Sequence, residues 1–237
     1  MISQKPITNI LKEPKMLAIH QPEHMPWLGF FDKMNLAEKF IILDDVQYRK
    51  NYFQNRNRIA GSDGEPKWIS VSTNKGSLNE KINEKKILKN SYIFPKKYKN
   101  LIYESYKNEA YFSVYSEELF ELIDDCGESL FEFNMDLIYF FRDKFNIDTQ
   151  IFFSSDLNYE GKKSDLISSL CKKMSASTYL SGPSGKDYLD FELFENSNIN
   201  LEFHEFIQQP YLSSNYHPNL SSLDYLFRLG PNYFNKK

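Results

Sequence analysis

A strand–helix–strand pattern near the start of the chain constrains the fold more than any other feature. Residues 15–20 form a short apolar run, residues 28–38 place apolar side chains three apart, and residues 39–44 form a second apolar run. Continuous apolar runs are typical of parallel strands, because helices cover both faces of their sheet. Two strands joined by a helix make a βαβ unit, which predicts an α/β fold with a parallel strand pair.

The rest of the chain continues this pattern. We expect further strands at residues 67–73, 148–154, 178–182 and 199–206, and helices at about 92–145, after Ser164 and at 220–230. The predicted architecture is a Rossmann-like parallel or mixed sheet flanked by helices. Residues 15–237 would form a single domain, with the helical segment at about 92–145 as an insertion or subdomain, and residues 1–14 a flexible tail.

The strand assignments predict a set of core residues. The inward side chains of the expected strands are Leu17, Ile19, Phe40, Ile42, Ile69, Val71, Ile151 and Phe153. Cys126 and Cys171 fit no metal-binding spacing and lie in helical apolar patterns, so we expect buried free thiols and a reducing compartment.

Charge and hydropathy exclude some classes of function. The formal charge of −3 argues against a strongly basic nucleic-acid-binding surface and leaves room for a local basic patch. The chain contains no apolar run of about 18 residues and its first residues lack a signal-peptide core, so we expect a cytoplasmic protein without a membrane span. The sequence is compatible with a homodimer.

Polar residues follow two of the predicted strands. His20 and Gln21 end the first strand, and Asp44 and Asp45 end the second. Ligands of open α/β sheets bind beyond the carboxyl ends of the strands, so these side chains are predicted to share one crevice. The alternative for His20 is a structural hydrogen bond to the backbone.

The loop after the first strand carries a second histidine and a tryptophan. Pro22 and Pro26 are expected to stiffen this loop, which places His24 and Trp27 among the candidate substrate-binding residues. Trp27 either covers the core or walls a pocket, and the sequence favours the core.

The two acids allow several roles. They suit a metal site, a sugar-hydroxyl acceptor or a helix cap, and we favour a hydrogen bond from His20 or from substrate. No third acid follows Asp44 and Asp45 at ligand spacing, so a metal centre is not predicted.

Residues 46–61 are the densest polar and aromatic stretch. Its cations are Arg49, Lys50, Arg56 and Arg58, its neutral donors include Gln47 and Asn55, and aromatic residues are interleaved with them. Guanidinium groups bind phosphate or carboxylate through two parallel hydrogen bonds, so the stretch is predicted to clamp an anionic substrate. The alternative is a solvated loop.

Residues 179–190 hold weaker candidates. Ser181 and Gly182 end a predicted strand, and Lys186 would balance a negative group nearby, although no P-loop or dinucleotide fingerprint is present. His204 reads as a packed strand residue and His217 as a surface residue.

Four blocks together carry a family resemblance. "AIHQPEHMPWLGFFDKM", "FIILDDVQYRKNYFQNRNRI", "YLSGPSGKDYLD" and "NYHPNLSSLDYLFRLG" resemble the WbqC-like protein family in that order, and they span residues 16–230. The resemblance implies a role in bacterial surface-polysaccharide (O-antigen) biosynthesis and leaves the chemistry open. The residues that match the family's blocks are His20, Gln21, Pro26, Gly29, Asp44, Asp45, Gln47, Asn55, Arg56 and Arg58.

Two classes of function follow from these residues. The first is an enzyme that transfers an acyl or aminoacyl group to the amine of a nucleotide-linked sugar. His20 would be the base, with Asp44 or Asp45 beside it. Gln21 or Asn55 would donate to the developing oxyanion, and Arg56 and Arg58 would bind the diphosphate. The sequence leaves the cofactor unknown and the donor open between an acyl thioester, an aminoacyl-tRNA and an ATP-activated acid. A nucleotidyltransferase-like enzyme is a lesser variant. The second class is a non-catalytic protein that binds a sugar nucleotide or a pathway partner.

Overall fold

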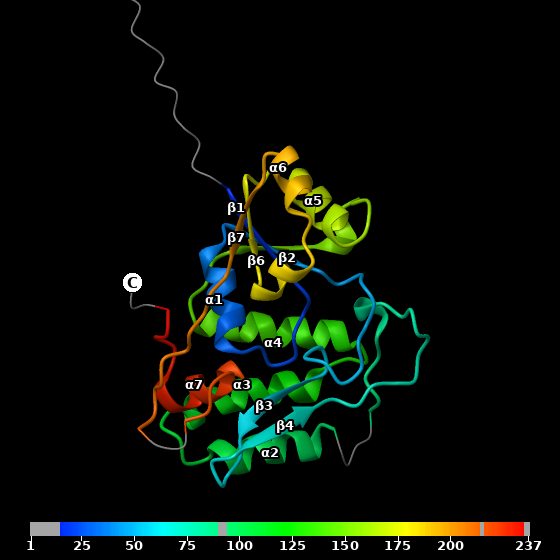
Figure 1. Cartoon of the computed structure of the whole chain (residues 1–237). Helices are drawn as coiled ribbons and strands as arrows, with labels where there is room; N and C mark the ends of the chain where they lie inside the picture. The colour runs from blue at the N-terminus through cyan, green and yellow to red at the C-terminus, as the bar shows by residue number, and fades with distance from the viewer. Residues whose placement is uncertain (1–14, 90–93, 214–215, 235–237) are drawn as a thin grey trace, which may run out of the picture.

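The computed structural model describes residues 15–89, 94–213 and 216–234, and its centre is a five-stranded parallel sheet (Figure 1). The strands are β1 (Met16–His20), β2 (Lys39–Ile42), β5 (Gln150–Phe153), β6 (Thr178–Ser181) and β7 (Asn200–Phe203). Their spatial order is β5-β2-β1-β6-β7, and every neighbouring pair is parallel. The α/β prediction is therefore confirmed. From β1 the chain adds β2 and β5 on one side of the sheet and then β6 and β7 on the other. The strand order therefore reverses between β1 and β6, which makes this the switch point of the sheet.

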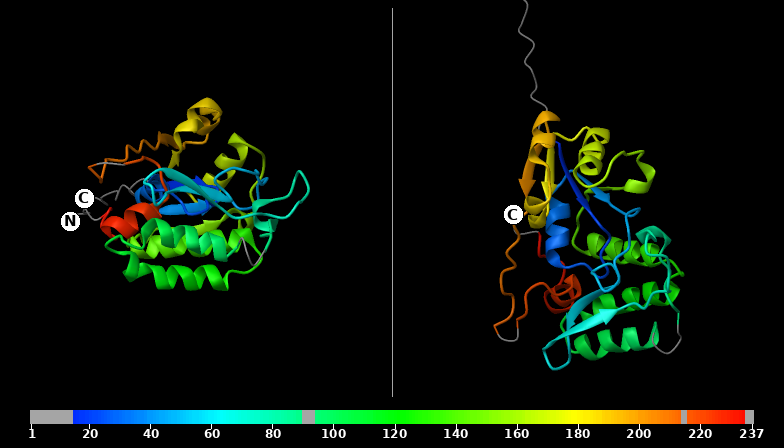
Figure 2. Two further views of the ribbon diagram at one scale, coloured as in Figure 1. Left: turned by 90° about the horizontal axis from the view of Figure 1, so that it is seen from below. Right: turned by 45° about the vertical axis from the view of Figure 1, so that its right-hand side comes forward.

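Helices cover both faces of this sheet (Figure 2). The helices are α1 (Leu28–Leu36), α2 (Lys96–Tyr106), α3 (Phe112–Asp125), α4 (Leu130–Lys144), α5 (Ser164–Lys173), α6 (Phe191–Asn196) and α7 (Ser222–Leu229). Three short 3-10 helices are η1 (Ile82–Glu84), η2 (Ser154–Asp156) and η3 (Pro183–Asp187). The green helices α2, α3 and α4 lie on one side of the sheet in Figure 2, and the yellow-green helix α5 and the orange helix α6 lie on the other.

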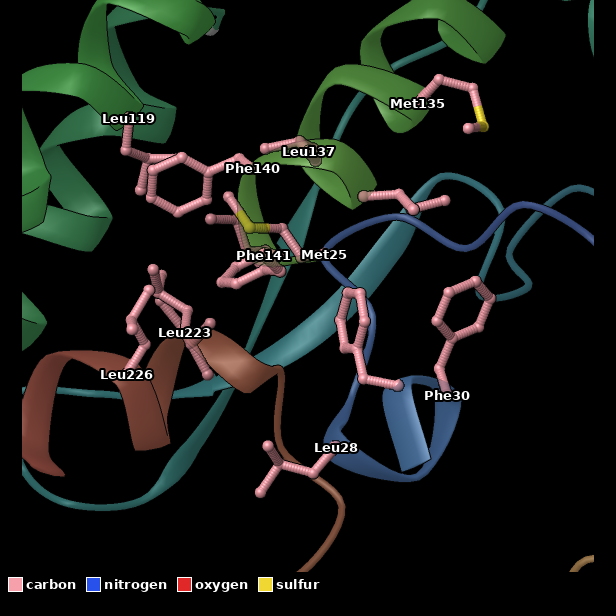
Figure 3. Close-up of a cluster of buried hydrophobic side chains, with 14 of the residues drawn as sticks. Met25, Leu28, Phe30, Leu119, Met135, Leu137, Phe140, Phe141, Leu223 and Leu226 are labelled. Carbon is pink, nitrogen blue, oxygen red and sulfur yellow. The ribbon is translucent and has the colours of Figure 1, made fainter. Parts of the chain in front are cut away.

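Alternation along the strands divides the core in two. Ala18 and Phe40 belong to a large apolar cluster with α1, α3, α4 and α7, whereas Leu17 and Ile41 belong to a smaller cluster with α5 and α6. Side chains of successive strand residues point to opposite faces, which explains the division. The ring of Phe31 lies 5.8 Å from that of Phe141 and so joins α1 to α4. Figure 3 shows side chains from these helices meeting in the large cluster.

A hairpin stands apart from the sheet. The expected strand at residues 67–73 is β4 (Pro66–Ser70), which pairs antiparallel with β3 (Arg56–Ala60) in a separate two-stranded sheet. The stretch at 46–61, interpreted from the sequence as a polar loop, therefore ends in a strand. Its period-2 pattern was obscured because buried Asn57 stands where an apolar side chain is usual.

The core prediction is confirmed for six of its eight residues, which are at most 4% exposed. Ile151 and Phe153 are only partly buried, because β5 is an edge strand. Cys126 and Cys171 are buried free thiols, as expected. Within the described ranges, no helix has the length and apolar character needed to cross a membrane. The predicted flexible tail, residues 1–14, lies outside the described residues.

We expect Ile42→Ala to lower the free energy of unfolding by about 2–5 kcal/mol, because it leaves a cavity at a fully buried position. Ile151→Ala should cost clearly less, because the edge strand leaves its side chain partly exposed. Urea unfolding of both variants measures the difference. Equal losses would contradict the placement of β5 at the edge.

Candidate functional site

A cavity of about 520 Å³ opens at the switch point between β1 and β6. The loop after β1, the segment 49–54 and the turn after β6 surround it, and α5 contributes one side chain. Its principal lining residues are His20, Gln21, Glu23, Lys33, Arg49, Tyr52, Phe53, Gln54, Tyr179, Gly182, Gly185 and Tyr188. In open α/β sheets this is the position where ligands bind.

Three titratable side chains meet at the floor of the cavity. The Nδ1 of His20 lies 2.9 Å from the carbonyl oxygen of Gln21, so the ring donates there and keeps a free lone pair on Nε2. That Nε2 lies 3.8 Å from Oε1 of Glu23. The Nζ of Lys33, which comes from α1, donates to the carbonyl oxygen of Ile19 at 2.9 Å.

Burial shifts the pKa of all three groups. It lowers the pKa of His20 to about 3, with a further contribution from the charge of Lys33. It raises the pKa of Glu23 to about 8 and lowers that of Lys33 to about 7, while the mutual attraction of these two groups works against both shifts. Near neutral pH the site therefore offers a neutral imidazole, a mostly protonated carboxyl group and an amine that is close to its titration point. Such a combination in a cavity is typical of functional sites.

A chain of hydrogen bonds connects the cavity to the helical layer. The side chain of Gln54 donates to Gln21 Oε1 at 2.7 Å, and its backbone carbonyl accepts from Asn134 Nδ2 at 2.7 Å. Asn134 Oδ1 accepts from Nδ1 of His24 at 2.8 Å, and Nε2 of His24 accepts from the Tyr98 hydroxyl at 2.8 Å. Segments distant in the sequence therefore fix the loop after β1.

The structure places His24 and Trp27 outside the cavity. His24 is fully buried, and burial lowers its pKa to about 4. Trp27 packs against Phe206, with ring centroids 5.4 Å apart, and its ring occupies the space that a side chain at position 29 would need, so only glycine fits there. Trp27 covers the core, which is the alternative that the sequence favoured.

Asp44 and Asp45 are brought together with each other but not with His20. Asp44 accepts hydrogen bonds from the Ser154 hydroxyl at 2.9 Å and from Asn83 at 2.9 Å. Asp45 accepts from the Tyr159 hydroxyl at 2.8 Å. Both carboxylates thus hold η2 and the segment around η1 to the end of β2. The described residues contain no group of three His, Cys, Asp or Glu side chains that could bind a metal ion.

The predicted anion clamp is divided between two places. Arg56 and Arg58 lie on β3, outside the cavity lining, and the Arg56 guanidinium stacks on Trp68 at 4.2 Å from the ring centroid. Asn55 is buried and donates to the carbonyl oxygen of Val71 at 3.0 Å. Gln47 donates to the carbonyl oxygen of Leu78 at 2.5 Å, outside the cavity. The arginine that lines the cavity is Arg49, 4.7 Å over the ring of Tyr52.

The turn after β6 contributes backbone atoms, rather than a charged side chain, to the cavity lining. Gly182 lines the cavity, and a Cβ at this position would meet nothing within 4 Å. Ser181 is buried behind it. Lys186 is exposed and pairs with Glu205 at 3.4 Å instead of lining the cavity. A ligand can therefore approach the backbone of this turn closely.

Sequence reasoning missed Glu23 and Lys33, and it counted Arg49 among the cations of residues 46–61 without choosing it as a site residue. Lys33 lies in the middle of an amphipathic helix, at a position that the apolar stripe assigned to solvent, and it is only 3% exposed. Glu23 lies between two residues that were singled out, His20 and His24. The sequence feature that could have identified Glu23 is its position three residues after His20, in the same stiff loop.

Comparison with known proteins gives one family and one similar protein. A family model described as the WbqC-like protein family matches residues 21–236. A protein of Mycobacterium tuberculosis (strain ATCC 25618 / H37Rv), named uncharacterized protein Rv1507c, is 30% identical over 221 residues, which cover 91% of this chain and 94% of that protein. No solved structure matches the chain.

The buried His24 predicts a pH dependence of stability. Its folded pKa of about 4 lies below the usual value of 6.5, so the unfolded state takes up a proton first and stability falls as pH drops from about 6.5 towards 4. We expect His24→Gln to reduce the slope of the unfolding free energy against pH by about 1.4 kcal/mol per unit in this window.

Urea unfolding at several pH values measures that slope. Glu23, with its raised pKa, contributes with the opposite sign, but it is present in both proteins and cancels. Ile42→Ala is the control, because it should lower stability equally at every pH. An unchanged slope in His24→Gln would show that the histidine is not buried in its neutral form.

We expect Lys33→Met to stabilise the protein at pH 7 by about 1–4 kcal/mol, because each unit by which burial lowers the lysine pKa costs about 1.4 kcal/mol and the lost hydrogen bond to the Ile19 carbonyl offsets part of the gain. The folded pKa of about 7 lies below the usual 10.5, so Lys33 costs stability increasingly as pH falls from 10.5 to 7. The gain should therefore shrink at pH 9.5. Lys39→Met, at a half-buried lysine bonded to the Met174 carbonyl, is the matched control and should give no such gain. Destabilisation by Lys33→Met at both pH values would contradict this account.

Proposed function

The chain belongs to the WbqC-like protein family, and we propose that it is a transferase of bacterial surface-polysaccharide biosynthesis that acylates the amine of a nucleotide-linked sugar. The observation that carries the proposal is the convergence of His20, Glu23 and Lys33 at the floor of a cavity at the β1/β6 switch point. A site that only binds a ligand has no need to gather three titratable groups with shifted pKa values in one cavity.

The lining of the cavity suits a nucleotide-linked sugar. Arg49 supplies a planar cation for the diphosphate at the rim. The open backbone at Gly182 allows phosphate or sugar oxygens to approach the turn after β6. Tyr52 and Tyr188 offer aromatic faces, 44% and 54% exposed, for a base or a sugar ring. The cation at the rim and the titratable groups at the floor orient the amino sugar inward.

The residues on the floor divide the proton transfers. The attacking amine forms the new C–N bond to the acyl carbonyl carbon, and His20 Nε2 accepts the proton that the nitrogen loses. Because the pKa of His20 is about 3, the imidazolium is short-lived and His20 acts as a relay that passes this proton on. Glu23, protonated near neutral pH, gives its proton to the leaving oxygen or sulfur as the old bond of the activated acyl donor breaks. The 3.8 Å separation of Nε2 and Oε1 then lets the proton return from His20 to Glu23.

Calorimetric titration with UDP- and dTDP-linked amino sugars, beside turnover with acyl donors, tests the proposal. We expect His20→Ala and Glu23→Gln to keep ligand affinity within about threefold and to lose turnover by about 10²-fold or more. His217→Ala, outside the cavity lining, is the control and should change neither. A wild-type protein that binds amino sugars without turning them over would be the non-catalytic binder instead. A wild-type protein that binds no nucleotide sugar overturns the proposal.

A further inference from the structure

The outward face of the β3–β4 hairpin displays cations and aromatic rings together. Arg56, Arg58 and Trp68 share this face, because Arg58 stands opposite Trp68 in the antiparallel register and Arg56 is two residues away. The other face, with Asn57, Ile59 and Ile69, is buried. Trp68 is 47% exposed, although an apolar ring of this size is usually covered.

This face continues into the rim of the cavity. The Arg56 guanidinium lies 4.2 Å from the centroid of Trp68, Trp68 lies 6.3 Å from Phe53, and Phe53 lies 5.6 Å from Tyr52. Arg49 covers Tyr52 at 4.7 Å, and Phe53, Tyr52 and Arg49 all line the cavity. We call these five residues (Arg49, Tyr52, Phe53, Trp68 and Arg56), together with Arg58, the aromatic–arginine strip.

The arginines of the strip lack acidic partners. None of the ion pairs between described residues includes Arg49, Arg56 or Arg58, whereas Arg228 pairs with both Asp224 and Glu109. The Nε of Arg56 is buried without a hydrogen-bond partner among those residues. The acids of the hairpin itself, Asp63 and Glu65, lie at its turn, where Asp63 pairs with Lys67. Arg56 and Arg58 thus remain available to an anionic ligand of the strip, while Arg49, where the strip meets the cavity, serves the diphosphate of the nucleotide sugar.

We propose that the aromatic–arginine strip binds the unpaired end of an RNA that carries the acyl group to the cavity. The inference rests on the transferase proposed above and names the class of its donor. Unpaired nucleotides combine a phosphate for each guanidinium with a base that stacks on an exposed ring, and proteins that bind single strands use this combination. An acidic peptide would use the arginines and leave Trp68 and Tyr52 without a partner. Because the strip continues into the rim of the cavity, an RNA bound along it would have its end near His20 and Glu23.

Fluorescence anisotropy with a labelled, unstructured RNA on the order of 10 nucleotides tests the proposal on the full chain. We expect binding at low salt, with a slope of log affinity against log salt of about −1.4, because Arg56 and Arg58 each neutralise one phosphate and each contributes roughly −0.7. Trp68→Ala should weaken binding about tenfold through lost stacking, and Arg56→Gln should reduce the slope by about 0.7.

Matched controls lie on the helical layer. Tyr103→Ala removes a ring with the same 44% exposure as Tyr52, and Arg142→Gln removes an arginine of α4. Both should leave RNA affinity unchanged. Melting curves confirm that each variant is folded.

The outcomes distinguish this proposal from the function of the cavity. Trp68→Ala and Arg56→Gln should keep their affinity for nucleotide sugars, and His20→Ala should keep its affinity for RNA. Absence of RNA binding in a protein that binds nucleotide sugars overturns the strip proposal alone. RNA binding that is insensitive to Trp68→Ala, equal affinity for duplex RNA, or binding to vesicles with anionic phospholipids in place of RNA also overturns it.

Discussion

The hydrogen bonds of His24 hold the candidate site together. Its ring joins Tyr98 of α2 to Asn134 of α4, and its backbone N–H donates to the carbonyl oxygen of Phe53 at 2.7 Å. Because every polar atom of the ring has a partner, the loop after β1 has one favoured position. The positions of His20 and Glu23 therefore depend on helices that contribute no side chain to the cavity lining.

The order of strands explains why the site could be located from sequence. Two apolar runs joined by a helix fixed β1 and β2 as parallel neighbours, and the polar residues after β1 had to lie at the carboxyl edge of the sheet. His20 and Gln21 lie there. The same reasoning brought Asp44 to that edge but could not choose its partner. Its carboxylate bonds to Ser154, a contact between residues 110 positions apart that no local period encodes.

In general, the sequence could not predict which polar groups from distant segments contact each other. A pattern of apolar residues reports which face of an element is buried, but it does not report which polar group meets which. Lys33 shows the limit most clearly, because a lysine on an amphipathic helix normally reaches solvent, whereas this amine bonds to the carbonyl oxygen of Ile19. Arg56 and Arg58 were recognised as cations, and only the hairpin register shows that they share a face with Trp68.

The site brings together ionisable groups whose burial lowers the stability of the fold. Burial disfavours the charged forms of both Glu23 and Lys33, and their mutual attraction offsets only part of that cost. A protein tolerates such a group of titratable residues when the rest of its core stabilises the fold enough to offset their burial. Here the large apolar cluster around α1 and α4 provides that stability. The depressed pKa of Lys33 and the raised pKa of Glu23 then follow from the same burial that shapes the cavity.

The hairpin gives the molecule a surface that its main sheet cannot provide. A parallel sheet is covered on both faces, so its strands offer a ligand only their ends. An antiparallel pair with one buried face keeps the other free, and β3 begins two residues after Gln54, at the rim of the cavity. The backbone bonds from Asn55 to the Tyr52 carbonyl and from Val71 to the Asn55 carbonyl fix this junction. In the proposed reaction, the buried ends of β1 and β6 hold the chemistry, while the free face of the hairpin determines the direction from which a long donor reaches it.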